Sequence, residues 1–237
     1  MKQLSLVASF IIGASFSAAP AFSHPVSKDA LSFNWTGFYA GVNVGLVKQT
    51  MNLTDKQGVS FNATVVQVAD PEFTGGLQAG YRRQMDTAWA SGVYGLELST
   101  NFSSTKYNGQ IGSAFSTYQL QSQYKLNNTT LVQAIGGIAA NNTLLFLAAG
   151  FSWTDISGSV INQVGVPFFN SFSVSKQSLG SAIGAGIEYS FTDNISARVK
   201  VDVVTPGVYT TTDNVGDSYQ LSNSIVQGAF GVNYKFG

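Results

Sequence analysis

The chain has 237 residues, of which only 10% are charged, and 12 basic residues balance 12 acidic ones to a formal net charge of zero. An ordinary soluble domain carries about 25% charged residues, and the balanced charge gives no basic footprint, so no nucleic-acid partner is expected. The absence of cysteine excludes disulfides and thiolate sites, and the single histidine, His24, disfavours His-dependent hydrolases and multi-histidine metal sites.

The N-terminus has the pattern of a targeting segment. Lys2 precedes an apolar stretch over residues 4–16 that is followed by small residues and is too short to span a bilayer. This pattern predicts a secretory signal peptide over residues 1–21, with cleavage after Ala21 or Ser23. We expect residues 22–34 to be a flexible segment and residues 35–237 to form the folded domain outside the cytoplasm.

Apolar residues then recur at every second position, which indicates strands rather than helices. Phe38, Ala40, Val42 and Val44 set this period, which returns in five later segments. Two further strands are less regular, and one of them, over residues 144–151, is continuously apolar. The alternation predicts eight strands, near residues 37–48, 72–83, 89–102, 129–140, 144–155, 177–191, 195–206 and 222–236. The fourth strand could begin as early as Phe115, because the same phase continues there.

The connections between these strands alternate in length. Short ones are expected at 84–88, 141–143 and 192–194. Long ones, rich in Ser, Thr, Asn and Gln, are expected at 49–71, 103–128, 157–176 and 207–221. Short turns on one side and long loops on the other are typical of an outer-membrane β-barrel.

Each predicted strand has one apolar face and one face of small or polar residues. The second face holds a set of glycines that could neither cover nor solubilise an outer surface: Gly41, Gly45, Gly76, Gly80, Gly184, Gly186 and Gly231. A soluble barrel such as a lipocalin points its apolar face inward. Here the glycines suit the narrow interior of an eight-stranded barrel, so we interpret the apolar face as lipid-facing.

Aromatic residues gather where the strands are expected to begin and end. At the short-turn ends these residues are Trp35, Phe38, Tyr81, Trp89, Tyr189, Phe191, Tyr234 and Phe236. Near the long-loop ends they are Phe73, Phe102, Phe151, Trp153 and Tyr209. Two such groups predict aromatic belts at the two membrane interfaces.

Three segments carry a resemblance to a known family. They are residues 34–41 (NWTGFYAG), 183–198 (IGAGIEYSFTDNISAR) and 230–236 (FGVNYKF). In this order and spacing the chain resembles the opacity-type, "porin family" small outer-membrane barrels of proteobacterial surface antigens. The resemblance implies an all-β fold, an eight-stranded antiparallel transmembrane up-and-down β-barrel with short periplasmic turns and four long extracellular loops.

The chain departs from the family pattern at several positions. Gln133, Ile135 and Gly137 stand on the fourth strand, where the family usually has arginines, and Lys200 and Gln227 replace an acidic residue and an arginine. The resemblance also implies that the barrel-assembly machinery reads an aromatic residue at the C-terminus of the last strand. In this chain Gly237 follows Phe236.

Charges on the inward face form the candidate site. These residues are Arg82, Glu97, Glu188, Arg198, Lys200, Asp202 and Lys235. A turn at 192–194 places Glu188 directly opposite Arg198, Gly186 opposite Lys200 and Gly184 opposite Asp202. The charges could form an ion pathway or a salt-bridge plug. We favour the plug, with Glu188 and Arg198 as a pair, because side chains fill so small a barrel.

No enzymatic site is predicted from the residues. Barrel-type lipases and proteases depend on a histidine, and His24 lies outside every predicted strand. The acid pairs Asp213/Asp217 and Asp70/Glu72 are interpreted as solvated loop residues, so no catalytic residue, metal or cofactor is expected. No nucleotide fingerprint occurs.

The sequence therefore predicts a non-enzymatic outer-membrane surface protein. In the first hypothesis the barrel anchors exposed loops for envelope structure and adhesion, with outer-membrane lipid and an unidentified extracellular ligand as partners. The alternative is a narrow porin that passes small solutes or ions.

Overall fold

The structure is a computed structural model that describes residues 33–55, 65–68, 70–86, 91–112, 119–162, 172–212 and 218–236. The predicted signal peptide, and all but the end of the segment expected to be flexible, lie outside these residues. No helix in the described ranges is long and apolar enough to cross a membrane.

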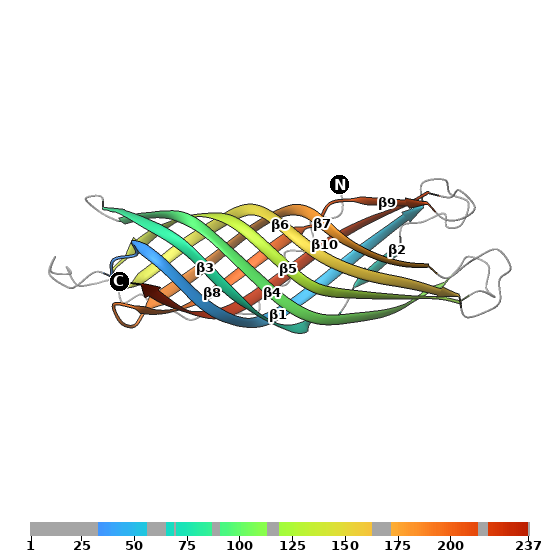
Figure 1. Cartoon of the computed structure of the whole chain (residues 1–237), viewed down its shortest axis with the longest axis horizontal. Coiled ribbons are helices and arrows are strands. Elements are labelled where there is room, and N and C mark those ends of the chain that lie inside the picture. Colours follow the sequence, from blue (N-terminus) through green and yellow to red (C-terminus); the bar gives the residue numbers. More distant parts are fainter. Residues whose placement is uncertain are drawn as a thin grey trace. The chain divides into compact units, whose positions relative to one another are not determined.

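Eight strands form a closed antiparallel ring (Figure 1). They are β1 (Gly37–Asp55), β3 (Glu72–Asp86), β4 (Ser91–Gly112), β5 (Gln119–Ala140), β6 (Thr143–Asn162), β7 (Phe172–Ser190), β8 (Ile195–Thr205) and β10 (Ser218–Phe236). Consecutive ring strands pair with each other, and β10 pairs back onto β1 from Phe38↔Phe236 to Asp55↔Tyr219. The predicted all-β, eight-stranded barrel is confirmed.

Two further strands of four residues each lie beside the closing pair. β2 (Val65–Val68) pairs with β1 beyond the end of β3, and β9 (Tyr209–Thr212) pairs with β10 beyond the end of β8. A proline separates each from the ring strand that it adjoins in sequence, Pro71 before β3 and Pro206 after β8. Proline has no N–H to donate to a strand ladder, which accounts for both interruptions.

The strands continue far into the segments predicted as long loops. Strand residues occupy parts of all four of these segments, for example 103–112 and 119–128 between the third and fourth ring strands. The fourth ring strand begins at Gln119. This agrees with the early start that was left open for the fourth strand, whereas the main prediction of a start near residue 129 was wrong. Most of the other loop bounds were also wrong, because strands can stay paired through their backbones where their residues are mainly polar.

The short connections fall close to the predicted positions. Asn141 and Asn142 form the β5–β6 turn, with Asn141 at a φ of 53°, a left-handed conformation that asparagine tolerates. The β7–β8 connection spans 191–194, and its register pairs Glu188 with Arg198, as predicted. Gly186 and Gly184 likewise pair with Lys200 and Asp202, as predicted.

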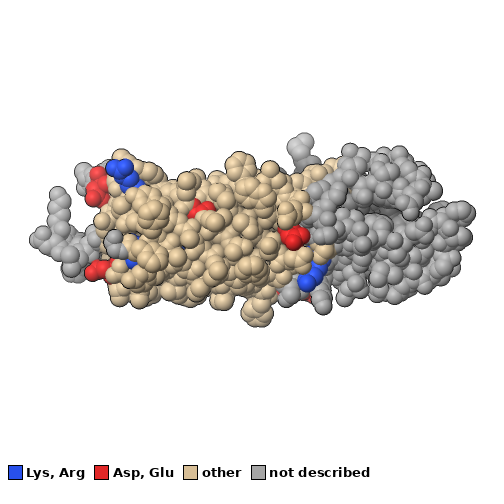
Figure 2. Space-filling model, viewed as in Figure 1, with Lys and Arg blue, Asp and Glu red and all other residues tan. Residues whose placement is uncertain are grey.

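Burial alternates along each ring strand, so one face points into the ring and the other outward. In β8, Val199 and Val201 are exposed while Arg198, Lys200 and Asp202 are buried. On the face that Figure 2 shows, few charged atoms lie in the middle of the described surface, and most lie towards its two ends. The outward band is therefore apolar and the interior polar.

Two inward glycines show how closely the interior is packed. A Cβ at Gly80 would lie 2.6 Å from the hydroxyl of Tyr39, and one at Gly186 would lie 2.5 Å from Cζ of Phe146. Both distances are far below van der Waals contact, so these glycines make room for an aromatic ring inside the barrel.

Candidate functional site

Six charged residues meet in the middle of the barrel interior, and we call them the central ion cluster. They are Arg82 from β3, Glu97 from β4, Glu188 from β7, and Arg198, Lys200 and Asp202 from β8. Each of them is at most 5% exposed. Three cations face three anions, so the formal charge of the cluster is zero.

Glu97 is the centre of this cluster. Arg198 donates to both of its carboxylate oxygens, from Nη1 to Oε2 and from Nη2 to Oε1 at 3.1 Å. Lys200 Nζ lies 3.2 Å from Oε1, and Arg82 Nη2 lies 3.9 Å from Oε2. A fork-shaped arginine contact of this kind is among the strongest that a carboxylate forms.

The other two acids have their own partners. Arg82 Nη2 lies 2.8 Å from Glu188 Oε2, and Lys200 Nζ lies 3.3 Å from Asp202 Oδ1. Every charge of the cluster therefore has at least one opposite charge within 4 Å. Buried charges are tolerated only when they are paired in this way.

Neutral polar side chains complete the coordination of the acids. Tyr39 donates its hydroxyl to Glu97 at 2.5 Å, and Ser196 donates to Glu188 at 2.5 Å. Asn233 Nδ2 also donates to Glu188, at 2.9 Å. Gln133 accepts from Lys200 Nζ at 2.6 Å and donates to Asp202 at 3.0 Å. Sequence reasoning gave Tyr39 and Gln133 no role in the cluster, although both lie on the inward phase.

The predicted pair of Glu188 and Arg198 is corrected. The two residues are opposite in register, but Glu188 pairs with Arg82, and Arg198 pairs with Glu97. These side chains cross the narrow interior and meet charges from β3 and β4. Strand register alone does not report such contacts.

Lys235 also differs from the prediction. It lies at the turn-side end of β10, where Nζ donates to the backbone oxygen of Asn34 at 2.7 Å and lies 4.4 Å from the ring centre of Phe33. It makes no ion pair with the central ion cluster. Lys235 instead holds the chain segment that enters the barrel.

That segment closes the turn-side end of the interior. Phe33 and Trp35 are buried and meet edge to face, with ring centres 4.5 Å apart. They belong to an apolar group that we call the turn-side apolar cluster: Phe33, Trp35, Val93, Ile135, Ala139, Leu144, Phe146 and Ala148. Trp35 was predicted to lie in an aromatic belt and is instead 3% exposed, because the chain turns into the barrel before β1 begins.

Residues 33–36 are also fixed by hydrogen bonds. The backbone N–H of Trp35 donates to the side-chain Oε1 of Gln84 at 2.9 Å, and the backbone N–H of Gln84 donates to Thr36 Oγ1 at 3.0 Å. Phe33 and Asn34, which end the segment expected to be flexible, thus have defined contacts. The Arg82 guanidinium lies 4.0 Å from the Tyr39 ring centre and 5.9 Å from that of Trp35, which links this end to the central ion cluster.

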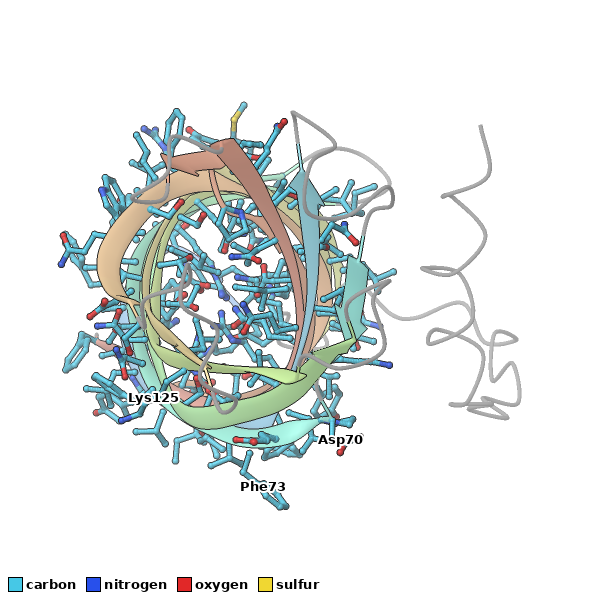
Figure 3. All side chains as sticks on the ribbon, turned by 90° about the vertical axis from the view of Figure 1, so that its right-hand side faces the viewer. Asp70, Phe73 and Lys125 are labelled. Atoms are coloured by element: carbon cyan, nitrogen blue, oxygen red, sulfur yellow. The ribbon has the colours of Figure 1, made fainter. Side chains whose placement is uncertain are left out.

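A second apolar group covers the other side of the central ion cluster, and we call it the loop-side apolar cluster. It consists of Val47, Leu126, Leu131, Ala182, Val204 and Ile225, none more than 2% exposed. The inward residues of β5 show the order of these layers. Leu131 lies in the loop-side apolar cluster, Gln133 bonds to Asp202 of the central ion cluster, and Ile135 lies in the turn-side apolar cluster. The ion cluster is therefore enclosed between two apolar layers. Figure 3 looks along the barrel and shows side chains filling its interior.

The remaining predicted belt residues that are described point outward at the turn-side end. Phe38, Tyr81, Tyr189, Phe191, Tyr234 and Phe236 are all exposed. They form neighbouring ring pairs, such as Phe38 with Tyr81, whose ring centres are 4.8 Å apart. Trp89 lies outside the described residues. Towards the loop side, Phe73, Phe102, Phe151 and Trp153 are exposed as well, and Figure 3 shows Phe73 projecting from the ring.

The described residues contain no group of three or more His, Asp or Glu that could hold a metal ion. His24, Asp213 and Asp217 lie outside them, and Asp70 is exposed on the outside of the ring (Figure 3). The arrangement inside the barrel is suited to neutralising buried charge.

The sequence of this chain matches a known protein family and two named relatives. The family model described as "Outer membrane protein beta-barrel domain" matches residues 9–236. The 31 kDa outer-membrane immunogenic protein of Brucella melitensis is 24% identical over 219 residues, which cover 90% of this chain and 89% of that protein. The Brucella suis protein of the same name matches equally.

Two solved structures of outer-membrane or surface proteins are similar to this chain. The outer membrane protein OprG of Pseudomonas aeruginosa superposes with a TM-score of 0.50 at 13% identity, covering 86% of this chain and 97% of that one. Neisserial surface protein A gives a TM-score of 0.44 at 14% identity, covering 85% and 98%. The outward apolar band is thus the lipid-facing surface of a protein of the Gram-negative outer membrane, with its short turns in the periplasm. The chain belongs to the outer membrane protein β-barrel domain family.

Proposed function

We propose that this protein is a closed, non-enzymatic outer-membrane anchor that presents the extracellular ends of its strands and their connections to partners outside the cell. The observation that carries the proposal is the enclosure of the central ion cluster between the two apolar clusters. A barrel whose interior is filled and neutralised in this way leaves its extracellular end as the surface available for function.

The energetics of the interior support a plug. A passing ion would have to cross two apolar layers and separate paired charges that are almost fully buried. Removing one partner of a buried ion pair costs about 3–5 kcal/mol, because the other charge remains without compensation. The balance of three cations and three anions also leaves no excess charge to attract an ion of either sign.

The extent of the strands supports a role at the cell surface. β4, β5, β6 and β7 continue past the loop-side apolar cluster in mutually paired arms, down to Gly112↔Gln119 and Val160↔Phe172. The Brucella relatives are named immunogenic proteins, and a comparable exposure to other molecules is proposed for this chain.

Solute uptake tests the closed interior. The protein would be refolded into liposomes, and swelling in an isotonic solution of a small sugar would be compared with swelling of empty liposomes and of liposomes that hold a porin. We expect the rate of the empty liposomes. A rate close to that of the porin would overturn the proposal and favour the narrow porin.

The presenting role has a separate test. Residues 163–171, which connect β6 to β7, would be replaced by a short Gly-Ser linker, and attachment of the bacteria to host matrix would be measured. We expect the variant to reach the outer membrane in wild-type amounts and attachment to fall. Unchanged attachment, both for this variant and for one shortened at 113–118, would contradict the presenting role.

A further inference from the structure

Arg83 is a charged residue on the lipid-facing side of the barrel. It follows Arg82 in β3, and the alternation of the strand buries Arg82 in the central ion cluster and leaves Arg83 exposed on the outer face. Among the described outward residues on the turn side of the central ion cluster, Arg83 is the only charged one. A charge on this face is costly in the middle of the apolar band and tolerated near its ends, so its depth matters.

Arg83 lies at the level of the turn-side aromatic belt. Tyr81, two residues before it on the same face, packs against the exposed ring of Phe38, with ring centres 4.8 Å apart. Successive strand residues are about 3.3 Å apart, so Arg83 is about 7 Å further along β3 towards the periplasmic turn. Aromatic belts lie at the headgroup level of a bilayer. The guanidinium group of Arg83 therefore lies among the lipid headgroups of the periplasmic leaflet.

Two exposed tyrosines flank Arg83 on the same outer face. Tyr94 of β4 lies directly opposite Arg83 in the strand register, and Tyr81 lies diagonally from Tyr94. The Cβ atoms of directly opposite residues are about 5 Å apart, and diagonal neighbours are within reach of aromatic side chains. One guanidinium group and two phenolic hydroxyls, all hydrogen-bond donors, are therefore available to the same ligand.

Within the described ranges, no acidic side chain neutralises Arg83. The ion pairs of these ranges lie in the barrel interior. Asp86, the nearest acid in the sequence, has the opposite strand phase and accepts hydrogen bonds from Gln84 and Ser91. The planar fork of an arginine fits two oxygens of a carboxylate or a phosphate. Because the chain supplies no carboxylate here, the phosphate of a surrounding lipid is the suitable partner.

We propose that Arg83, Tyr81 and Tyr94 form a binding site for the phosphate diester of a phospholipid in the periplasmic leaflet. The Arg83 guanidinium binds two phosphate oxygens, and the tyrosine hydroxyls donate to the same group. The acyl chains lie on the apolar outer face of β3 and β4, where Leu77 and Leu96 are exposed. This site lies at the opposite end of the barrel from the surface proposed to meet extracellular partners and does not depend on that role.

Native mass spectrometry of the protein released from detergent micelles tests this site. The probe is phosphatidylglycerol, and the comparison lipid is a diacylglycerol with the same acyl chains and no phosphate. We expect one phosphatidylglycerol to be retained at concentrations at which the diacylglycerol is lost. Equal retention of both lipids would overturn the inference, because acyl chains alone would then account for binding. Displacement of phosphatidylglycerol by millimolar inorganic phosphate would assign the site to a free phosphate and contradict the lipid.

Matched variants locate the site. Arg83→Gln should weaken phosphatidylglycerol binding on the order of tenfold, and Arg83→Lys, which keeps the charge without the fork, should weaken it less. Tyr94→Phe keeps the ring and loses the hydroxyl, and should weaken binding about threefold. Lys125→Gln removes an exposed cation from the loop-side half of the outer face (Figure 3) and should bind like wild type.

Two results would contradict the inference. One is unchanged binding by the Arg83→Gln protein, or by the Tyr94→Phe protein if Arg83→Gln does not fold. The other is an equal loss of binding for Lys125→Gln and Arg83→Gln, which would mean that any exposed cation retains the lipid. Neither result bears on solute uptake, so the closed interior is tested separately.

Discussion

Glu188 and Arg198 lie directly opposite each other across the β7–β8 hairpin, yet each forms its ion pair with a residue on the facing wall of the barrel. Arg198 pairs with Glu97 on β4, and Glu188 pairs with Arg82 on β3. The interior is narrow enough for these side chains to cross it. The pairs therefore join opposite sides of the ring. They fill the interior and also neutralise the charges buried in it.

Double-mutant cycles should reveal these partners. In urea unfolding from lipid vesicles, Glu97→Gln and Arg198→Gln should each cost on the order of 3–5 kcal/mol, and the double variant should cost less than their sum. The same cycle for Glu188 and Arg198 should give a smaller coupling free energy. A larger coupling for Glu188 with Arg198 would mean that the pairs run along the hairpin.

Trp35 should matter more to stability than a neighbouring aromatic residue on the lipid face. Trp35→Ala empties a space within the turn-side apolar cluster and should lower the free energy of unfolding by about 3–5 kcal/mol. Phe38→Ala, three residues away and 66% exposed, should cost less. Equal losses for the two variants in urea titrations would contradict the enclosure of Trp35.

Depth in the membrane should decide the cost of a charge on the outer face of β8. Val199→Arg places a charge in the apolar band and should cost about 2–4 kcal/mol. Ile195→Arg, on the same face but at the turn-side end of the strand, should cost about 0–1 kcal/mol. Folding yields into vesicles measure the difference, and equal tolerance would argue that this face does not meet lipid.

Inward and outward glycines should respond differently to the same substitution. Gly186→Val drives a side chain into Phe146, only 2.5 Å from the position of its Cβ, and should destabilise the barrel by about 1–3 kcal/mol. Gly136 points outward with no heavy atom within 4 Å of a Cβ, so Gly136→Val should fold like wild type. Equal melting temperatures of the two variants would contradict the packing described around Phe146.

The ring and its faces could be predicted because their cause is local. Lipid on one side and a filled interior on the other impose a period of two, so the alternation of Val199 and Lys200 is readable from the sequence. The β7–β8 register followed from the short turn predicted at 192–194. The early start of the fourth strand was open as an alternative because its phase continues past residue 128 towards Phe115, and the structure starts this strand at Gln119. The continuation at 103–112 has no such regular alternation and was not predicted.

The alternation and the hairpin register do not predict which side chains meet across the interior. Nothing in the spacing of Arg82, Glu97, Glu188 and Arg198 says which charge meets which, because the partners lie on opposite walls. Trp35 precedes the first alternating residue, and an aromatic residue there suits a belt as well as the interior. Gln133 was noted only as a departure from arginine, although its inward phase and its two-sided amide fit the bridge that it forms between Lys200 and Asp202.

Single-channel recording tests the closed interior most directly. The protein would be inserted into a planar bilayer in concentrated salt, and a porin added afterwards would show that the bilayer reports conduction. The enclosure of the central ion cluster between the two apolar clusters predicts no unitary current steps from the wild-type protein. Reproducible steps of a single amplitude would contradict it and would show that ions cross the barrel.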